Sequence, residues 1–285
     1  MPCVLIVGYG DLGKELGRRL VEQCFYVAGL SRSKRQHDDS VTLLMGDVTR
    51  PETLTDLPTI NPQILVYCVA ADAQSDDSYR AHYVDGLRHV LQALDRADHL
   101  QHVFFVSSTR VYGQTTDTLL SDDDPALPVD FGGQRLMEAE QLLTGLTCGH
   151  TALRLSGIYG PGRTRMLKLA ADPTHWPPNT WSNRIHRDDA AAFIASLIQR
   201  AMKGEHLAEN YIVTDNQPTP QHEVLRWLAG HSGVDVSNIH TPPPVGGKRL
   251  ANQRLRETGF QLTYPDYQAG YTALLLAETA SQQNS

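Results

Sequence analysis

The first residues of the chain place the tightest constraint on its fold. The apolar run CVLIVG (Cys3–Gly8) leads directly into Gly8-x-Gly10-x-x-Gly13, and an amphipathic stretch follows with leucines four residues apart. A short run rich in Val and Ile is typical of a strand buried on both faces, and the leucine spacing indicates a helix. A glycine-rich turn between such a strand and such a helix predicts the start of a βαβ series.

The same alternation continues along the first half of the chain. Further strand-like runs lie at Phe25–Arg32, Val41–Asp47, Ile64–Ala71, His102–Ser108 and Thr151–Gly157. Helical patterns are expected at Tyr79–Ala97 and from Phe131 onward, and only a short polar stretch separates the second strand from the third. We therefore predict an α/β fold, a doubly wound parallel Rossmann sheet with helices on both faces.

The pattern changes after Gly157. A Pro-, Gly-, Trp- and Arg-rich stretch precedes a helix at Arg187–Gly204 and a strand at Asn210–Asp215, and shorter elements follow. We expect residues 1–157 to form a dinucleotide-binding domain. Residues 158–285 are expected to form mainly a smaller C-terminal substrate lobe, with 184–214 returning to the Rossmann domain.

Composition excludes several classes of protein. The net charge of −7 lacks the basic average of a duplex nucleic-acid binder, and no run approaches the roughly 20 apolar residues of a membrane span. The four cysteines show no CxxC pair, and the histidines lack nearby ligands at metal-binding spacing. We expect a cytoplasmic protein without a metal, a nucleic-acid partner or a membrane partner.

The glycine motif predicts a cradle for a pyrophosphate. Gly8 permits the tight turn, Gly10 lets the backbone approach the phosphates, and Gly13 lets the helix meet the strand. The exposed N–H groups and the helix dipole attract negative charge. The remaining residues expected in this turn are Tyr9, Asp11 and Leu12.

The end of the second strand bears on the choice of cofactor. An acidic residue there would bind the ribose hydroxyls of NAD, but the chain reads Leu30-Ser31-Arg32-Ser33-Lys34-Arg35 and has no acid before Asp38. Arg32, with Ser31 and either Lys34 or Arg35, suits a 2′-phosphate. NADP is therefore favoured over NAD, the alternative being a solvated loop.

Six short motifs occur in an order that resembles a known superfamily. They are Gly46–Pro51, Tyr67–Ala71, His82–Leu94, Phe105–Gly113, Leu153–Arg163 and Arg184–Ala191. Together they resemble the extended short-chain dehydrogenase/reductases, specifically the atypical members similar to NAD-dependent epimerase/dehydratases (nucleoside-diphosphate-sugar epimerases). The resemblance covers nearly the whole chain.

The resemblance implies roles for individual residues. Ser108 matches the catalytic Ser or Thr that hydrogen-bonds the reacting oxygen, although idle hydroxyls at a strand end are the alternative for Ser107 and Ser108. The implied cofactor contacts are Asp47 and Val48 at the adenine, Val69, Ala70 and Ala71 at the inner phosphate and ribose, Ser107, and Tyr159 near the nicotinamide.

The implied substrate contacts lie mainly in the second half of the chain. Arg163 and Arg184 match regions that bind a nucleotide-sugar diphosphate in relatives, with solvated arginines as the alternative. Trp176 and Trp181 could stack on a base or sugar, or form a hydrophobic flap. Ser108 and Thr109 complete the expected substrate contacts.

One motif of the family is missing. The family carries Tyr-x-x-x-Lys on the helix after the VYG loop, whereas this helix begins FGGQRLMEAE. Spacing matches Phe131 and Arg135 to that pair, while alignment on Glu140 matches Gly132 and Leu136. Neither register supplies a phenol, and Arg135 cannot lose a proton. Arg135 and Tyr112 are the weak catalytic candidates, and Tyr159, His186 and Asp188 are other donors from nearby motifs.

Two functions remain open at this point. The first is an NAD(P)-dependent oxidoreductase or epimerase acting on a nucleotide-sugar or related carbonyl or alcohol substrate, with Ser108 polarising the oxygen. The second is a catalytically impaired NADP-binding sensor. By analogy with the family, the helix at Tyr79–Ala97 and the helix from Phe131 would build a homodimer.

Overall fold

The computed structural model describes residues 1–33, 40–94 and 99–283, which form two compact units. Unit 1 contains Met1–Gly113, Ala126–Arg154 and Ala190–Tyr211, and unit 2 contains Gln114–Pro125, Leu155–Asp189 and Ile212–Ser285. Of residues 184–214, which the sequence analysis expected to return to the Rossmann domain, Ala190–Tyr211 lie in unit 1 and the remainder in unit 2. The loop Gln114–Pro125, which the sequence analysis placed in the first domain, belongs to unit 2.

A seven-stranded sheet forms the centre of unit 1 and confirms the predicted fold class. Its order is β11-β7-β5-β4-β1-β2-β3, and the pairs from β5 to β3 are parallel. The strands are β1 (Cys3–Val7), β2 (Tyr26–Ser31), β3 (Val41–Met45), β4 (Ile64–Tyr67), β5 (His102–Ser108), β7 (Gly149–Leu155) and β11 (Asn210–Val213). Val4 to Val7 have no exposed surface, as a strand covered on both faces requires.

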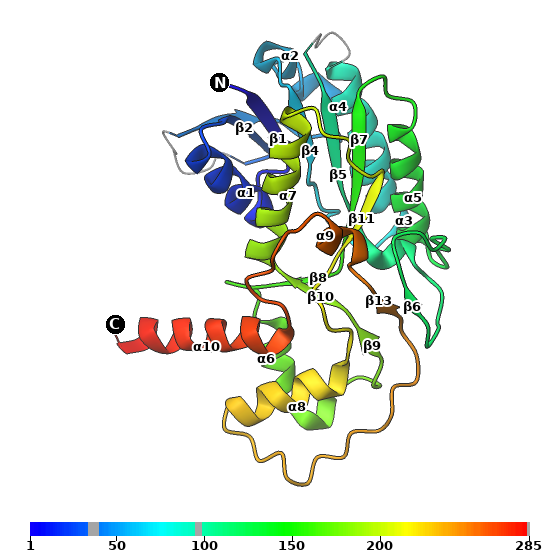
Figure 1. Cartoon of the computed structure of the whole chain (residues 1–285), viewed down its shortest axis with the longest axis vertical. Coiled ribbons are helices and arrows are strands. Elements are labelled where there is room, and N and C mark those ends of the chain that lie inside the picture. The colour runs from blue at the N-terminus through cyan, green and yellow to red at the C-terminus, as the bar shows by residue number, and fades with distance from the viewer. Residues whose placement is uncertain (34–39, 95–98, 284–285) are drawn as a thin grey trace. The chain divides into compact units, whose positions relative to one another are not determined.

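Helices cover both faces of this sheet. Figure 1 shows α1 (Asp11–Glu22) and α7 (Arg187–Met202) on one side and α4 (Gly86–Ala93) and α5 (Phe131–Leu143) on the other. The shorter helices are η1 (Pro51–Thr53), α2 (Leu57–Ile60), α3 (Asp76–Tyr79), the π-helical segment η2 (Arg80–Asp85) and η3 (Thr109–Val111).

The helix expected at Tyr79–Ala97 begins earlier than the hydrophobic pattern indicated. Ser75 caps α3 by accepting a hydrogen bond from the Ser78 N–H at 3.3 Å, so the helical path starts at Asp76. The path then passes through η2 into α4, which ends at Ala93. Residues 95–97 of the expected helix, and residues 34–39 between the second and third strands, lie outside the described residues.

Unit 2 is built from short strand pairs and helices. The pairs are β8 (Gly157–Tyr159) with β10 (Arg184–His186), β9 (Trp181–Ser182) with β12 (Thr219–Pro220), and β6 (Leu119–Leu120) with β13 (Arg249–Leu250). The helices are α6 (Arg165–Ala170), η4 (Pro173–His175), α8 (Gln221–His231), α9 (Gln253–Glu257) and α10 (Tyr267–Gln283). Tyr159, Tyr267 and Tyr271 pack with the apolar face of α8 in one buried cluster.

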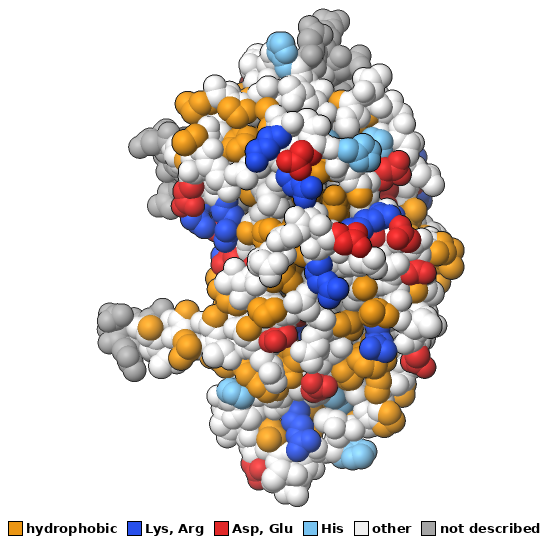
Figure 2. Space-filling view, viewed as in Figure 1, with side chains coloured by type: hydrophobic (Ala, Val, Ile, Leu, Met, Phe, Trp, Pro, Cys, Tyr) orange, Lys and Arg blue, Asp and Glu red, His pale blue; other side chains and the backbone are white. Residues whose placement is uncertain are grey.

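Two further observations concern the charged side chains on the surface and the length and apolarity of the helices. Lys and Arg are interspersed with Asp and Glu on the face shown in Figure 2. Within the described parts of the chain, no helix combines the length and apolarity needed to cross a bilayer.

Candidate functional site

The glycine turn after β1 has the predicted shape. Gly8 has φ +94°, and a Cβ at this position would lie 2.6 Å from the carbonyl of Cys68. A Cβ at Gly13 would lie 2.6 Å from the carbonyl oxygen of Gly8, so Gly13 is what lets α1 approach β1. Beside Gly10 the nearest such contact is 3.9 Å, which leaves room for a ligand.

The main-chain bonds show which amides of the turn remain for a phosphate. The N–H groups of Tyr9 and Gly10 donate to the carbonyls of Leu30 and Gly8 at 2.9 and 2.7 Å. Gly10 is the N-cap of α1 and provides no side-chain cap. An anion would therefore be held by the first turn of α1, including the amides of Leu12 and Gly13.

The side chain of Tyr9 shapes the turn. It is 4% exposed, and a Cβ at Gly17 of α1 would lie 2.6 Å from its hydroxyl oxygen, while one at Gly29 of β2 would lie 2.6 Å from its ring atoms. The ring therefore fills the space between α1 and β2, and only the main chain of Tyr9 is left to face a cofactor. Asp11, the first residue of α1, is exposed.

The expected adenosine contacts lie at the carboxyl ends of β2, β3 and β4. Ser31 Oγ donates to the carbonyl of Ser33 at 2.9 Å, and Asp47 accepts hydrogen bonds from the main chain and hydroxyl of Thr49. Val48 is 5% exposed. In the loop after β4, Ala70 is exposed, and Val69 and Ala71 are half-buried. The expected partners Lys34 and Arg35 lie outside the described residues.

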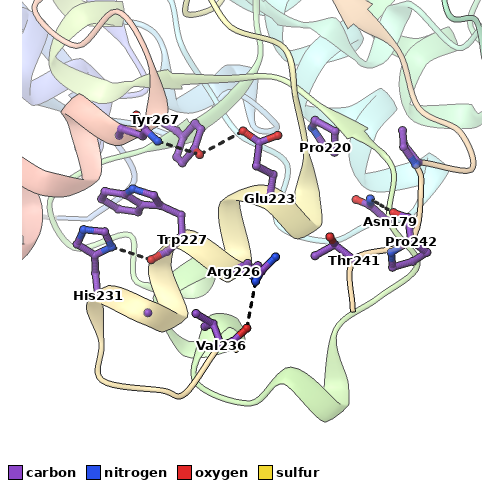
Figure 3. A pocket seen from close by; sticks show the side chains of 13 residues that line it. Asn179, Pro220, Glu223, Arg226, Trp227, His231, Val236, Thr241, Pro242 and Tyr267 are labelled. Atoms are coloured by element: carbon purple, nitrogen blue, oxygen red, sulfur yellow. Dashed lines mark hydrogen bonds between the residues drawn. The ribbon is translucent and has the colours of Figure 1, made fainter. Parts of the chain in front are cut away.

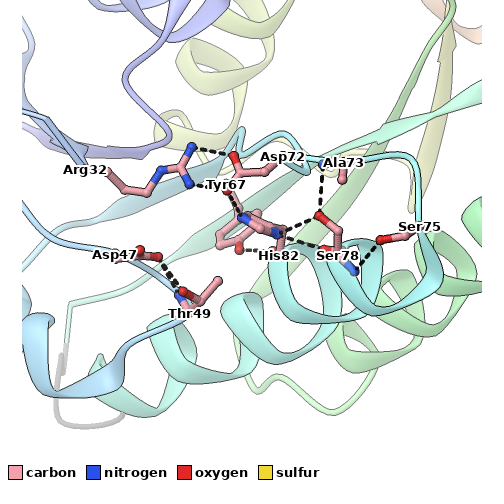
Figure 4. Close-up of polar contacts among 9 residues, drawn as sticks. All are labelled: Arg32, Asp47, Thr49, Tyr67, Asp72, Ala73, Ser75, Ser78 and His82. Carbon is pink, nitrogen blue, oxygen red and sulfur yellow. Dashed lines mark hydrogen bonds and ion pairs between the residues drawn. The ribbon is translucent and has the colours of Figure 1, made fainter.

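Arg32 makes an ion pair that the sequence analysis missed. Its Nη2 donates to Asp72 Oδ1 at 2.6 Å and its Nη1 donates to Asp72 Oδ2, while His82 Nε2 lies 3.2 Å from Oδ2 (Figure 4). The hydrogen bond from Arg32 lowers the pKa of Asp72. Asp72 belongs to the loop after β4, so the acid beside Arg32 comes from a different strand.

The end of β5 contains a buried ionic network. Ser107 Oγ donates to Glu140 Oε1 at 2.6 Å, and Arg154 Nη2 donates to Glu140 Oε2 at 2.8 Å. Arg154 Nη1 donates to the hydroxyl of Tyr112 at 2.7 Å, and Tyr112 has no exposed surface. Ser107 and Tyr112 are thus held in the interior of unit 1, which removes the geometric support for Tyr112 as a proton donor.

Ser108 is the hydroxyl at this strand end that remains half-buried. Its Oγ accepts a hydrogen bond from the Arg110 N–H at 3.2 Å and caps η3, and its own proton can still be donated. Thr109 is 8% exposed. The geometry is compatible with the role expected for Ser108 and favours it over Ser107.

The two faces of α5 separate the two registers left open by the sequence. Gly132 and Leu136 are buried on the same helical stripe as Glu140, whose carboxylate bonds Ser107 of β5. Phe131 instead packs edge-on against Tyr79 of α3, with ring centroids 5.4 Å apart. We infer that the family's Tyr and Lys positions correspond to Gly132 and Leu136.

Arg135, the weak candidate for the lysine position, is engaged by α3. Its Nε and Nη2 donate to the two carboxylate oxygens of Asp76 at 2.8 and 2.9 Å, and its Nη1 donates to Glu138. A contact between this guanidinium and a ribose stays a prediction that the geometry does not support.

The guanidinium of Arg110 occupies the space beside Gly132. A Cβ on Gly132 would lie 2.5 Å from Arg110 Nε and Nη1. Arg110 Nε donates to both oxygens of Asp130 at 3.0 Å, and its Cζ lies 5.0 and 4.9 Å from the rings of Tyr79 and Phe131. With Arg110 in this place, the space beside Gly132 does not admit a larger side chain.

Unit 2 contains a cavity of about 830 Å³ with a cationic lining. Four basic side chains line it, namely Arg163, Arg165, Lys168 and Arg184. Arg184 is only 5% exposed, and its Nη1 has no hydrogen-bond partner among the residues that the structure describes. Its Nη2 donates to Ser182 Oγ at 2.5 Å, and its Cζ lies 5.5 Å from the ring centroid of Tyr267. Four basic side chains around one cavity suit an anion. The expected substrate residues Arg163 and Arg184 are therefore brought together.

Asp215 adds a buried carboxyl group next to Arg184. It is 1% exposed, and its N–H donates to the Arg184 carbonyl at 2.7 Å. Burial raises the pKa of this carboxyl to about 7, and the charge of Arg184 offsets part of that shift. The polar end of a buried strand was the only available sequence signal for Asp215.

The other residues of unit 2 that the sequence analysis singled out contact neighbouring groups of the protein. Burial raises the pKa of Tyr159, whose ring centroid lies 4.5 Å from that of Tyr271. Trp176 Nε1 donates to the Leu169 carbonyl at 3.0 Å, and Trp181 lies under Arg249 at 4.8 Å. Neither tryptophan lines the cationic cavity. A nicotinamide contact by Tyr159 stays a prediction.

The other proton donors considered, His186 and Asp188, lie at β10 and the first turn of α7, where Asp188 pairs with Arg187.

A second cavity of unit 2, of about 670 Å³, is lined by α8, the 236–244 segment and Tyr267 (Figure 3). Several of its polar groups are engaged with one another or with the main chain. Tyr267 donates to Glu223, and Arg226 donates to the Val236 carbonyl. Of the described residues that line this cavity, only Arg226 is a Lys or Arg, so it lacks the cluster of basic side chains that distinguishes the cationic cavity. We assign it no ligand.

The fold and the glycine turn define a class of protein. A parallel sheet with helices on both faces, and a helix entered through Gly8, Gly10 and Gly13, define a dinucleotide-binding Rossmann protein of the extended short-chain dehydrogenase/reductase type. The chain belongs to the RmlD substrate binding domain family, whose model matches residues 1–275.

Solved structures support this placement. A Methylobacillus flagellatus protein assigned as an NAD-dependent epimerase/dehydratase is 51% identical, with TM-score 0.89 and coverage of 98% of this chain and 99% of that chain. A functionally unknown conserved protein from Silicibacter pomeroyi is 25% identical, with TM-score 0.71 and coverage of 97% and 99%. The Bordetella bronchiseptica enzyme WbmG in complex with NAD and UDP is 17% identical, with TM-score 0.78 and coverage of 96% and 92%, and shows the fold alone. No curated protein matches the chain.

Proposed function

We propose that this chain binds NAD(P) through unit 1 and acts as an oxidoreductase or epimerase/dehydratase on a nucleotide-sugar or a related carbonyl or alcohol substrate. The observation that carries the proposal is the glycine turn, because positive φ at Gly8 and a start of α1 without a side-chain cap suit a bound phosphate. Family membership and the Methylobacillus flagellatus relative support the reaction class.

The chain's own residues have distinct roles in this proposal. A bound nicotinamide supplies hydride exchange. The first turn of α1 holds the diphosphate, and the Ser108 hydroxyl donates a hydrogen bond to the substrate oxygen. Gly132 and Leu136 bring no proton to the site, because neither side chain can titrate. The rate contribution of general acid–base catalysis, typically about 10²–10⁴-fold, therefore has to come from another group or is absent.

We further propose that the dinucleotide is NADP in preference to NAD. The support is Arg32 directly after β2, because a guanidinium fork matches a phosphate better than a ribose diol. Replacing Arg32 with Ala should weaken NADPH binding and leave NADH binding nearly unchanged. A wild-type preference for NADH that survives this substitution would overturn the assignment.

The cationic cavity of unit 2 is proposed as the site of the substrate diphosphate. Its support is the set of four basic side chains that line it, Arg163, Arg165, Lys168 and Arg184. UDP is a suitable probe, since WbmG was solved with UDP. We expect Arg163→Ala and Lys168→Ala, both at exposed positions, to weaken UDP binding while NADPH binding is retained. UDP affinity unchanged in both variants would remove the cavity from the proposal.

The second candidate function is a dinucleotide sensor without turnover. The observation that favours it is Arg110, which fills the space beside Gly132. NADPH and NADH titrations followed by absorbance assays with a panel of nucleotide-sugars separate the two candidates. Substrate-dependent oxidation or reduction that Ser108→Ala abolishes supports the enzyme. Tight cofactor binding with no turnover on any substrate supports the sensor.

Assembly and location are also proposals. A homodimer through α4 and α5 follows the analogy with the family, and equilibrium sedimentation of the full chain would test it. A cytoplasmic location accords with the four cysteines, which are free thiols in the structure.

A further inference from the structure

The ion pair between Arg32 and Asp72 joins the segments that follow β2 and β4. In the sheet, β1 lies between β4 and β2, and Arg32 directly follows β2 while Asp72 lies in the loop after β4. Two side chains that start on either side of β1 therefore meet across its carboxyl end (Figure 4). In open α/β sheets, ligands bind outside the carboxyl ends of the strands, so this pair lies where the adenosine side of a dinucleotide is expected.

In this pair, the hydrogen-bond donors of Arg32 that would recognise a phosphate are already bonded to Asp72. Both terminal nitrogens of Arg32 donate to the two oxygens of Asp72, which is the forked geometry that a phosphate would also use. The two side chains are 52% and 50% exposed, so the pair is open to exchange with a ligand. Asp47 contributes a second negative charge, since it raises the pKa of Arg32 after the larger effect of Asp72.

The two dinucleotides place different demands on this pair. A 2′-phosphate carries close to two negative charges, so it must take the fork of Arg32 away from Asp72 and remain beside a carboxylate that repels it. A ribose diol needs no cation, and it can donate a hydrogen bond to a carboxylate oxygen while the ion pair stays formed. Asp72 therefore opposes binding of the 2′-phosphorylated cofactor and does not oppose binding of the diol form.

We propose that Asp72 is a specificity-determining residue of the cofactor site. By holding Arg32, its carboxylate lowers the affinity for the 2′-phosphorylated dinucleotide relative to the diol form. Arg32 gives NADP its higher affinity than NAD, and Asp72 makes the difference between the two affinities smaller. This inference rests on the proposed binding of NAD(P) in unit 1.

The test is the Asp72→Asn variant, with dissociation constants for NADPH and NADH measured by fluorescence titration at low salt. We expect the NADPH constant to fall by about two- to fivefold, because the ion pair that the phosphate must break is half exposed and such pairs hold only weakly. The NADH constant should change less than about twofold. High salt should shrink the difference, since both side chains are half exposed.

Two comparisons make the result specific. In an Arg32→Ala background, Asp72→Asn should improve NADPH binding much less, because no fork remains to be released. Asp76→Asn is the matched control, since it also removes a carboxylate that accepts two hydrogen bonds from an arginine, but that partner is Arg135 on α5. It should leave both cofactor affinities unchanged. Melting temperatures of all variants establish that they are folded.

The outcomes separate this inference from the proposed function. Equal changes for both cofactors in Asp72→Asn, or a full gain in the Arg32→Ala background, would show that Asp72 does not act through Arg32. Wild-type protein that binds both cofactors, with a ratio unchanged by Asp72→Asn, contradicts only the role of Asp72. Wild-type protein that binds neither removes the proposed function and this inference together.

Discussion

At the scale of single residues, Glu140 holds the end of β5 against α5 and β7. Its carboxylate accepts from Ser107, and it forms an ion pair with Arg154 in which both side chains are 9% exposed. Such a pair adds little net stability compared with an apolar core, but removal of one partner leaves a buried charge without compensation. The network therefore fixes the position of Ser107 and, next to it, of Ser108.

Glu140→Gln should destabilise the protein strongly. The substitution keeps the shape and removes the charge opposite Arg154, so we expect a loss of about 3 kcal/mol in the free energy of unfolding. Urea denaturation with circular dichroism measures this loss. The control is Glu138→Gln on the same helix, where the pair with Arg135 is more exposed and about 0.5 kcal/mol or less is expected. Equal losses in the two variants would contradict a buried network.

Asp215 gives a prediction for pH. Its folded-state pKa of about 7 lies above the ordinary value of 3.8, so folding favours the neutral carboxyl. The stability linked to this group is fully present below about pH 4 and is lost as the pH rises through 7. The difference of about three pKa units corresponds to about 4 kcal/mol in all, and more than half of it falls between pH 5 and pH 8.

We therefore expect the loss of unfolding free energy between pH 5 and pH 8 to be about 2 kcal/mol smaller in Asp215→Asn than in the wild type. The asparagine retains an oxygen for the Gln217 N–H, which bonds Asp215 Oδ1 at 3.1 Å. Urea denaturation at both pH values measures the effect. The same loss in both proteins would mean that Asp215 ionises normally in the folded state.

The sequence predicted the role of a residue only where that role depends on neighbours in the same short segment of the chain. The glycine turn and Arg32 follow from local spacing, because each depends on neighbours along the chain. Asp72 and Arg110 act on residues from other strands and loops, and no local pattern indicates which side chain they meet. The position of Arg163 near Arg184 came from the resemblance, while Arg165 and Lys168 had no motif to distinguish them from solvated residues of a loop.

At the scale of elements, the long strands and helices were predicted, and the short strands of unit 2 were not. The strands of unit 1 are continuous apolar runs and its long helices have a clear period, so each bears its own signal. In unit 2 the paired strands are two or three residues long, which is too short for any period. Their existence depends on tertiary pairing, such as that of Arg184–His186 with Gly157–Tyr159.

The first turn of α5 allows a test of the space beside Gly132. Gly132→Ala should cost about 1 kcal/mol, because the clash with the Arg110 guanidinium outweighs the better helix propensity of Ala. In an Arg110→Ala background the same substitution should stabilise by up to about 1 kcal/mol, since the clash is gone. Thermal denaturation of the two single variants and the double variant measures this coupling.

Gly133→Ala is the matched control for that cycle. A Cβ at Gly133 would lie 2.7 Å from the main-chain oxygen of Arg110 and 2.8 Å from the Cβ of Pro128, so the obstacle is not the guanidinium. Gly133→Ala should cost about 2 kcal/mol in both backgrounds. If Arg110→Ala relieves Gly133→Ala as well as Gly132→Ala, the side chain of Arg110 does not specifically occupy the space beside Gly132.

At the scale of the whole molecule, each unit has its own buried interior and its own proposed ligand. In unit 1 the glycine turn follows strand β1 of the sheet, and unit 2 contains the cationic cavity. A ligand that binds only the folded state stabilises it by mass action, whatever the chemistry that follows. Ligand-dependent melting therefore tests the two proposed sites without requiring turnover.

NADPH at about one hundred times its dissociation constant should stabilise the full chain by about 2.7 kcal/mol, which raises the melting temperature by about 5 °C for a protein of this size. Differential scanning calorimetry of the full chain with NADPH, NADH and UDP in turn measures the shifts. Arg32→Ala should reduce the NADPH shift and retain the NADH shift, while Lys168→Ala should reduce only the UDP shift. A melting temperature that neither dinucleotide changes at millimolar concentration would contradict the glycine turn as a cofactor site. A UDP shift in the same protein would still support the cavity of unit 2, because its basic side chains belong to a separate unit.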